Sequence, residues 1–286
     1  MLLIAGGLLD PNLQALAHAA QRLGVAWLDW RHAKDSSPPC HWELGLDGDP
    51  PWGPGPLPRG AFVRQDVFAS LADPRPEVTR RAQGWYIAAQ GWLLSQPSVR
   101  VFNADMSQRA LNKPAALMRA RHHGLTIPHT WVSNDTSRMR SRLAEPMIAK
   151  PVGGGGYCQT LDEALTGVEV AHAAMPALIQ PRLISPEVRL FVIGNAAHAF
   201  RLSSPSLDYR AQQDAEVEVI AVPGQVDALR ALMADLRMDF GAADFKTDPH
   251  TGELVFLELN TSPMFARFDL ASQGALTESM VRQLIR

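Results

Sequence analysis

The sequence predicts an α/β fold, and the pattern is already present near the N-terminus. A short apolar run at 2–5 ends in Gly6 and Gly7, a helical pattern covers 13–23, and a second apolar run follows at 25–30. This strand–helix–strand order is typical of an open α/β unit. The two glycines lack the spacing of a dinucleotide-binding turn, so the pattern does not favour a Rossmann cofactor site.

Composition narrows the class of protein. The chain has 286 residues, of which 46% are hydrophobic and 20% charged, with a net charge of -2. This excludes a disordered or fibrous protein, and the near-neutral charge argues against a nucleic-acid partner. Two cysteines cannot build a disulfide framework. The apolar N-terminal run is too brief for a membrane span and has no basic flank typical of a signal peptide. We therefore expect a cytoplasmic protein that does not associate with membranes.

The remaining elements of the first domain follow from breaks in periodicity. A proline- and glycine-rich stretch at 36–58 predicts a surface loop. A strand is expected at 61–68, a helix from Pro76 to 94 and a strand at 99–104. We place the first domain at 1–104.

The next segment, 105–180, begins with a helical pattern that ends at Gly124. Its first residue is left open, because Ser107 is a good N-cap whereas Pro114 favours a start close to itself. Beyond this helix, we expect strands at 129–133, 147–152 and 177–181, and helices at 135–144 and 162–175.

The last segment, 181–286, is expected to begin with a hairpin. Two apolar runs, 187–193 and 196–202, flank Gly194 and Asn195, which is a hairpin signal. The expected elements that follow are strands at 216–222, 240–247 and 253–260, and helices at 224–237 and 274–285.

The first feature that indicates chemistry is a lysine followed by four glycines. Lys150 closes an apolar strand, and glycines occupy 153–156. Glycines let backbone N–H groups approach phosphate oxygens, and the lysine supplies a cation. The alternative is a flexible hairpin with one exposed lysine.

The second feature is a set of hard oxygen ligands on two strands. Asp244 lies near the middle of one strand, and Glu258 and Asn260 are two residues apart on the next, so they share a face. Such a set suits Mg²⁺ that also binds nucleotide phosphates. A polar face on an antiparallel strand pair is the alternative.

The third feature is a pair of arginines, Arg189 and Arg201, on the two strands of the expected hairpin. Guanidinium groups bind phosphates or carboxylates in bidentate fashion. Solvated surface arginines are the alternative.

These three features, in this order, resemble the ATP-grasp superfamily, and most closely its RimK-like carboxylate–amine ligases. The resemblance covers about 105–265. It implies an α/β pre-ATP-grasp domain at 1–104 and two α+β subdomains, 105–180 and 181–286, that sandwich ATP, with the metal site in the second.

The resemblance also implies roles for individual residues. Lys113 and Lys150 take the places of the two phosphate-binding lysines, with Lys150, Arg189 and Arg201 stabilising the transferred phosphoryl group. The mobile glycine loop corresponds to Gly153, Gly154, Gly155 and Gly156. The adenine hinge and the acid of the ribose or substrate pocket correspond to Gln180, Pro181, Arg182 and Glu187. The metal ligands, for two Mg²⁺ ions or alternatively Mn²⁺, correspond to Asp244, Glu258 and Asn260.

The family chemistry implies that ATP phosphorylates a carboxylate and that an amine then attacks the acyl phosphate. The substrate is expected to be an amino acid, a peptide or a small metabolite, and a homodimer or homotetramer is the usual assembly. Two alternatives stay open: a small-molecule kinase and a nucleotide-binding module without catalysis.

Two further positions are candidates for substrate contact. Arg64 ends a strand of the first domain, and a structural ion pair explains it equally well. Asp208, Tyr209 and Arg210 form a polar cluster in a loop, for which a solvated crossing is the alternative.

Overall fold

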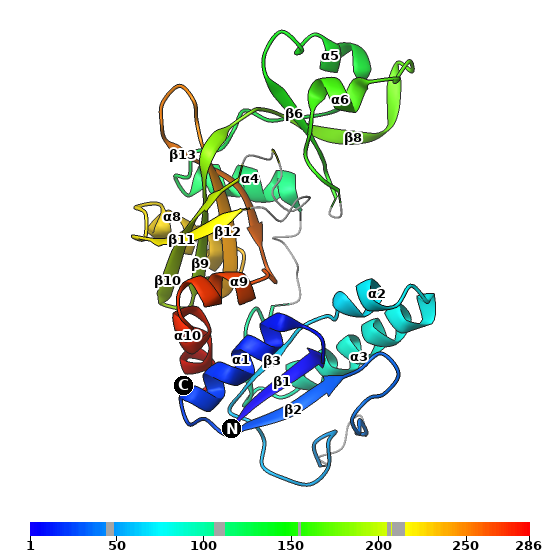
Figure 1. Cartoon of the computed structure of the whole chain (residues 1–286), viewed down its shortest axis with the longest axis vertical. Helices are drawn as coiled ribbons and strands as arrows, with labels where there is room; N and C mark the ends of the chain where they lie inside the picture. The colour runs from blue at the N-terminus through cyan, green and yellow to red at the C-terminus, as the bar shows by residue number, and fades with distance from the viewer. Residues whose placement is uncertain (44–48, 106–111, 154–155, 205–206, 208–214) are drawn as a thin grey trace. The chain divides into compact units, whose positions relative to one another are not determined.

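The structure is a computed structural model that describes residues 1–43, 49–105, 112–153, 156–204, 207 and 215–286. The chain divides into two compact units (Figure 1). Unit 1 comprises Met1–Ala104 and Met264–Arg286, and unit 2 comprises Asp105–Pro263. Within the described part of the chain, no helix combines the length and apolarity that a membrane crossing requires.

Unit 1 is built on a parallel four-stranded sheet, which confirms the predicted α/β class. The strand order is β2-β1-β3-β4, and β1 pairs in parallel with both β2 and β3. The strands are β1 (Leu2–Gly7), β2 (Trp27–His32), β3 (Gly60–Val63) and β4 (Arg100–Val101). The strand expected at 61–68 ends at Val63, and the last expected residue, Phe68, begins a short helix, α2 (Phe68–Ala72).

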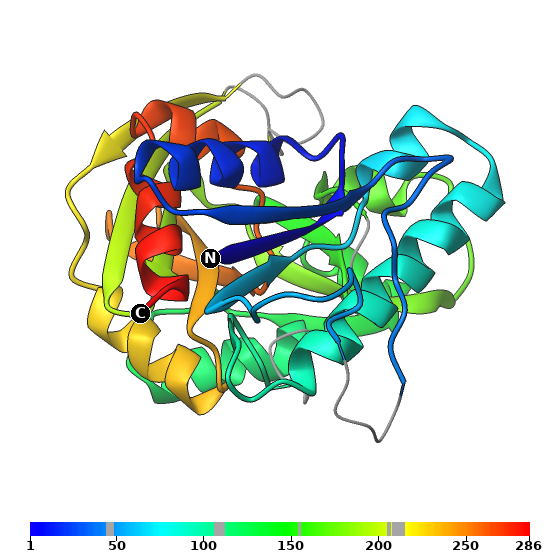
Figure 2. The same cartoon turned by 90° about the horizontal axis from the view of Figure 1, so that it is seen from below.

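The helices of unit 1 come from both ends of the chain. They are α1 (Pro11–Arg22), α2, α3 (Pro76–Leu94), α9 (Ala266–Ala271) and α10 (Ala275–Leu284). Helix α10 runs beside α1 (Figure 2). It fully buries Leu276, Met280 and Leu284, and this burial holds it in unit 1. The predicted subdomain 181–286 therefore differs in its last part, which packs with the N-terminal sheet.

Aromatic packing holds part of the proline-rich loop against the sheet of unit 1. The Trp52 ring lies edge-on to Trp30 at 5.3 Å and to Trp92 at 4.9 Å between centroids. Trp30 and Trp92 are buried in the core. Edge-to-face aromatic pairs contribute about 0.5–1.5 kcal/mol beyond the area that they bury.

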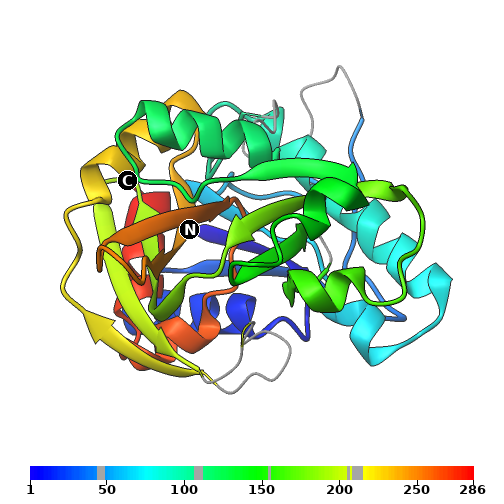
Figure 3. The same cartoon turned by 90° about the horizontal axis from the view of Figure 1, so that it is seen from above.

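Unit 2 contains two antiparallel sheets, and the smaller has the order β5-β8-β6-β7. Helices α5 and α6 pack on it (Figure 3). Its elements are β5 (Trp131–Asp135), α5 (Thr136–Arg140), β6 (Met147–Pro151), β7 (Gln159–Thr160), α6 (Leu161–Leu165) and β8 (His172–Pro181). The predicted helix at 162–175 is wrong beyond Leu165: Gly167 adopts a φ of 72°, and His172 pairs with β5 as a strand.

The larger sheet of unit 2 has the order β11-β10-β9-β12-β13. Its strands are β9 (Ile184–Ile193), β10 (Ala196–Ser203), β11 (Glu216–Ile220), β12 (Phe240–Thr247) and β13 (Leu254–Asn260). Helices α4 (Lys113–His122) and α8 (Val226–Asp235) share one apolar core with this sheet. Val188, Leu190 and Phe245 belong to that core, so the alternate residues of β9 and β12 face the other way.

Candidate functional site

A cavity in unit 2 is lined by the residues of β9 and β12 that face away from the apolar core. Strands β6 and β8 and the first residue of α4 complete its wall. The cations of the lining are Lys113, Lys150, Arg182 and Lys246. The carboxylates are Glu187, Asp244 and Glu258. The cavity is therefore lined by groups of both signs.

The pairing of β9 with β12 puts two pairs of opposite charge on one face. Lys246 lies directly opposite Glu187, and Asp244 lies directly opposite Arg189. Lys246 Nζ is 3.2 Å from Glu187 Oε2, and Arg189 Nε is 3.4 Å from Asp244 Oδ1. Directly opposed residues point to the same side of a sheet, so the four side chains form one charged row.

Strand β13 brings the other two predicted metal ligands to the same place. Glu258 lies directly opposite Asp244, and Asn260 lies two residues further along β13, opposite Ala242 and on the same face. Asn260 Nδ2 donates a hydrogen bond of 3.0 Å to Asp244 Oδ2. A register shift after Asp244 leaves an extra residue, Leu257, on β13, and both Leu257 and Glu258 line the cavity.

This donor set fits a hard divalent cation. Two carboxylates and an amide from neighbouring strands offer oxygen atoms, which Mg²⁺ prefers. No group of three or more His, Cys, Asp or Glu side chains suited to a metal occurs among the described residues. Here Lys113 Nζ lies 3.2 Å from Glu258 Oε2 and balances part of the carboxylate charge.

The start of α4 positions Lys113. The Asn112 side chain caps the helix by accepting a 3.0 Å hydrogen bond from the Ala115 N–H, and Pro114 occupies the first turn. The described helix therefore begins at Lys113, which agrees with the expected start close to Pro114. The expected cap Ser107 lies outside the described residues.

Lys150 lies at the end of β6 and lines the same cavity. Its burial lowers the pKa of its ammonium group below the usual value, and the nearby charges of Lys246 and Lys113 lower it further, whereas Cys158 and Glu258 act in the opposite direction. Three ammonium groups in one cavity repel one another, and an anionic ligand relieves that repulsion.

The end of β8 forms the apolar and polar wall of the cavity. Gln180 is 2% exposed and its Nε2 donates a 2.9 Å hydrogen bond to Thr130 Oγ1. Its Oε1 is buried and accepts no hydrogen bond from the described residues. Pro181 and Arg182 follow Gln180 in the lining. Apolar side chains of the lining include Ile148 from β6, Leu257 from β13 and Leu183.

Several predicted site residues do not join this group. Arg201 lies opposite Val188, on the other face of the sheet from Arg189, and forms a 3.2 Å ion pair with Glu218. Arg64 belongs to unit 1, where its Nε lies 2.9 Å from Asp10 Oδ2 in a buried ion pair.

The glycine loop is only partly described. Gly156 lines the cavity, and Gly153 does not. The other positions expected in the glycine loop and the substrate loop lie outside the described residues: Gly154, Gly155, Asp208, Tyr209 and Arg210.

Sequence reasoning missed Lys246. It stands two residues after Asp244 on β12, so the strand period places both on one face. That spacing was a sufficient signal, since Asp244 was itself assigned to the metal site.

Comparison with known proteins identifies the fold. No family model matches the sequence, and no curated protein matches it. The structure is similar to the ATP-grasp ligase PsnB complexed with a minimal precursor, with a TM-score of 0.75, 22% identity and 99% of each chain covered.

Two other solved structures are similar to this chain in fold. The macrocyclase MdnC of Microcystis aeruginosa, bound with its precursor peptide MdnA, gives a TM-score of 0.72 at 17% identity, over 100% of this chain and 99% of that one. A Chryseobacterium gregarium RiPP-associated ATP-grasp ligase, in complex with ADP and a leader and core peptide, gives 0.70 at 18% identity, over 99% and 96%. The chain has the fold of ATP-grasp ligases along its length.

Proposed function

We propose that this chain, with its ATP-grasp fold, is an ATP-dependent ligase that joins a carboxylate to an amine and acts on a peptide. The observation that carries the proposal is the cavity of unit 2, where Lys113, Lys150 and Lys246 meet Asp244 and Glu258. In this fold, that combination suits a nucleotide polyphosphate with a divalent cation.

The wall formed by β8 suits an adenine base. Gln180 Oε1 is a buried acceptor that lacks a donor among the described residues. An exocyclic amino group is a donor of the right kind, and Ile148 and Leu257 offer apolar surface to a ring. Glu187 lines the same cavity and offers a carboxylate to ribose hydroxyls.

The charged row suits the phosphates. Asp244, Glu258 and Asn260 would hold Mg²⁺, which when bound offsets the charge of the phosphate oxygens. The Lys113 side chain is partly exposed and has a flexible stem. Its ammonium group can therefore leave Glu258 and bind a phosphate oxygen instead. Lys150 gains the anionic partner that restores its pKa toward the usual value.

The proposed reaction has two displacements. A substrate carboxylate oxygen bonds to the γ-phosphorus as the bond to the β-phosphate oxygen breaks, giving an acyl phosphate and ADP. The amine nitrogen then bonds to the acyl carbon, phosphate leaves, and the amine proton passes to solvent or phosphate. Lys150 and Arg189 stabilise the charge that develops on the transferred group.

A peptide is the substrate class that the comparisons support. Of the three solved structures named above, two are ATP-grasp ligases and one is a macrocyclase, and each is in complex with a precursor or with a leader and core peptide. A small metabolite and an amino acid remain outcomes of the test.

The test measures ADP formation from Mg·ATP with a panel of carboxyl-bearing peptides and metabolites. For any compound that raises the rate, ¹⁸O in its carboxylate is expected in the released phosphate and the product is expected to lack one water. A stable phosphorylated product contradicts the ligase proposal and favours a kinase. Nucleotide binding without ADP formation for any compound favours a non-catalytic module.

A pair of variants tests the site itself. Glu258→Gln is expected to lower ADP formation by at least about a hundredfold, since it removes the negative charge of a metal ligand. Glu253→Gln is the matched control, because Glu253 is exposed at the turn before β13. Full activity of Glu258→Gln contradicts the assignment of the metal site.

A further inference from the structure

Unit 1 contains a second polar cavity, at the carboxyl end of strand β2. We call it the His32 cavity. Its lining comes from the segment that follows β2 and from helices α2 and α3: His32, Lys34, Asp35, Ser36, Ala69 and Arg81, with their neighbours. Its volume is about 90 Å³. A cavity of about 10–15 Å³ holds one water, so this one accommodates several non-hydrogen atoms.

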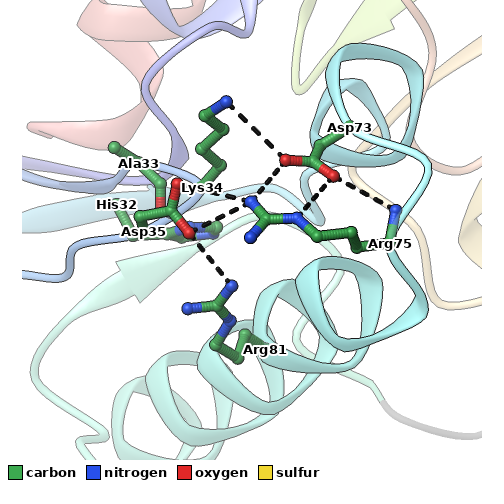
Figure 4. A network of polar contacts seen from close by, with 7 residues as sticks. All are labelled: His32, Ala33, Lys34, Asp35, Asp73, Arg75 and Arg81. Carbon is green, nitrogen blue, oxygen red and sulfur yellow. Dashed lines mark hydrogen bonds and ion pairs between the residues drawn. The ribbon is translucent and has the colours of Figure 1, made fainter.

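The charged side chains around the His32 cavity form one network (Figure 4). Asp35 Oδ1 lies 3.2 Å from an Arg75 nitrogen and 3.3 Å from an Arg81 nitrogen. Asp73 accepts a 2.8 Å hydrogen bond from Arg75 Nε and lies 3.6 Å from Lys34 Nζ. Three cations thus share two carboxylates, so this network carries one net positive charge. A third carboxylate, Asp66, acts on His32 and accepts hydrogen bonds from the N–H groups of Phe68 and Ala69.

His32 adds a buried polar atom that needs a partner. The residue is 4% exposed and lines the cavity. Its Nδ1 lies 3.4 Å from the Ala33 carbonyl oxygen, which only accepts, so a neutral ring carries its proton on Nδ1. Nε2 is then an acceptor, and no described residue donates to it. A buried acceptor without a donor costs free energy that a ligand can recover.

The cavity lies on the carboxyl side of the parallel sheet, beyond its edge strand β2. In open α/β sheets ligands bind on this side, most often where the strand order reverses, which here is between β1 and β3. His32 is the last residue of β2, which pairs in parallel with β1.

We propose that the His32 cavity binds a small oxyanion that also carries a hydrogen-bond donor. The class comprises α-hydroxy and α-amino carboxylates and monohydrogen phosphate. Arg81 and Lys34 receive the anionic oxygens, and the hydroxyl or amino group of the ligand donates to His32 Nε2. The site lies within unit 1 and does not depend on the proposed ligase activity.

The test uses the full chain and calorimetric titration at constant ionic strength with glycolate, acetate and inorganic phosphate. Glycolate has both groups, whereas acetate lacks the donor. Glycolate is expected to bind roughly fivefold more tightly than acetate, the effect of one hydrogen bond. Equal binding of the two, or binding of none of the three probes, overturns the proposal.

Substitutions of two neighbouring arginines test whether a bound probe occupies this cavity. Arg81→Gln is expected to weaken glycolate by at least about tenfold, since it removes a charged donor. Arg80→Gln is the matched control, because Arg80 is the exposed neighbour on α3 and does not line the cavity. Equal effects of the two substitutions, or a phosphate signal that Arg81→Gln leaves unchanged, contradict the assignment.

Substitutions of His32 test whether the ligand must donate a hydrogen bond to its Nε2. His32→Phe is expected to remove the preference for glycolate over acetate, and His32→Gln, which keeps an acceptor, is expected to retain part of it. Survival of the full preference in His32→Phe overturns the role of Nε2. Phosphate binding that His32→Phe weakens, without glycolate binding, assigns the site to phosphate instead of a carboxylate.

Discussion

Each unit contains a cluster of ion pairs between basic and acidic side chains. The two clusters differ in how far their side chains are exposed to solvent. In unit 1, Arg64 Nε lies 2.9 Å from Asp10 Oδ2, and the two side chains are 4% and 0% exposed. In unit 2, Lys113 Nζ lies 3.2 Å from Glu258 Oε2, and the side chains are 28% and 24% exposed. These two pairs differ in exposure: the pair of unit 1 is closed to solvent, whereas the pair of unit 2 lies open at a cavity.

The cluster of unit 1 is a closed network. Asp10 Oδ1 accepts hydrogen bonds from the backbone N–H and the Nδ2 of Asn12, at 2.8 and 2.7 Å. Asn12 Oδ1 accepts from the N–H groups of Phe265 and Ala266, at 2.6 and 2.8 Å. The network joins the start of α1 to the start of α9, which explains Arg64 without a substrate.

The cluster of unit 2 is open to exchange. Its cations are long lysine side chains that line a cavity, and the pKa of Lys150 is lowered there. An incoming anion can therefore replace carboxylates as the partner of these cations, whereas Asp10 and Asn12 are buried and already bonded within unit 1.

The largest expected effect is on the closed network. Asp10→Ala removes the cap of α1 and leaves the buried guanidinium of Arg64 without this carboxylate. Loss of one partner of a buried ion pair costs about 3–5 kcal/mol. Urea unfolding is expected to show a decrease of that size in the free energy of unfolding.

The control for this prediction is Asp29→Ala, which removes a partner of Arg31 in an ion pair where Asp29 is 43% exposed. A decrease below about 1 kcal/mol is expected for it. Equal decreases for the two variants would contradict the contrast between buried and exposed pairs.

The second expected effect is on ligand affinity in the open cluster. Lys150→Met is expected to weaken ADP binding by at least about tenfold, because a charged hydrogen bond contributes about 1.5–3 kcal/mol. The free energy of unfolding without ligand is expected to stay the same or rise, since a buried charge is removed. Calorimetric titration and urea unfolding measure the two quantities. A loss of stability without a loss of affinity would place Lys150 among structural residues.

The third prediction concerns pH. Burial lowers the pKa of Lys150 in the folded chain, so between that value and the usual 10.5 the unfolded chain binds more protons. The contribution of Lys150 to stability therefore rises as pH increases through this window. The difference in unfolding free energy between wild type and Lys150→Met is expected to change in that direction between pH 7 and 10.5. A difference independent of pH would show that the lysine is not perturbed.

The smallest expected effect is at Arg201. Its side chain is 45% exposed and its partner Glu218 is 66% exposed. Arg201→Gln is expected to change the free energy of unfolding by less than about 0.5 kcal/mol and to leave ADP affinity unchanged. A large loss of ADP affinity in this variant would show that Arg201 contributes to the phosphate site.

Strand periodicity predicted the metal ligands of the candidate site, whereas Lys113, Gln180 and Glu187 were implied by the family resemblance. Asp244, Glu258 and Asn260 were expected to share a face, and the register confirms that they do. The same rule correctly applied would have added Lys246. It would also have removed Arg201, since the two-residue turn after Ile193 places Phe200, and not Arg201, opposite Arg189.

Other features depend on contacts between distant segments. Helix α10 packs beside α1, and no local signal in its sequence selects that partner. The extra residue at Leu257 is a register shift that alternation does not predict. The segment at 172–175 looks helical by composition, but pairing with β5 makes it a strand.

We expect the open cluster of unit 2 to bind a nucleotide together with a divalent cation. Thermal unfolding of the wild type and of Glu258→Gln, with a non-hydrolysable ATP analogue and Mg²⁺, measures this binding. Ligand at about 100 times its dissociation constant adds about 2.7 kcal/mol of stability, a shift of several degrees. We expect that shift for the wild type and a much smaller one for Glu258→Gln. Equal shifts for the two proteins, or none for the wild type, would contradict this expectation.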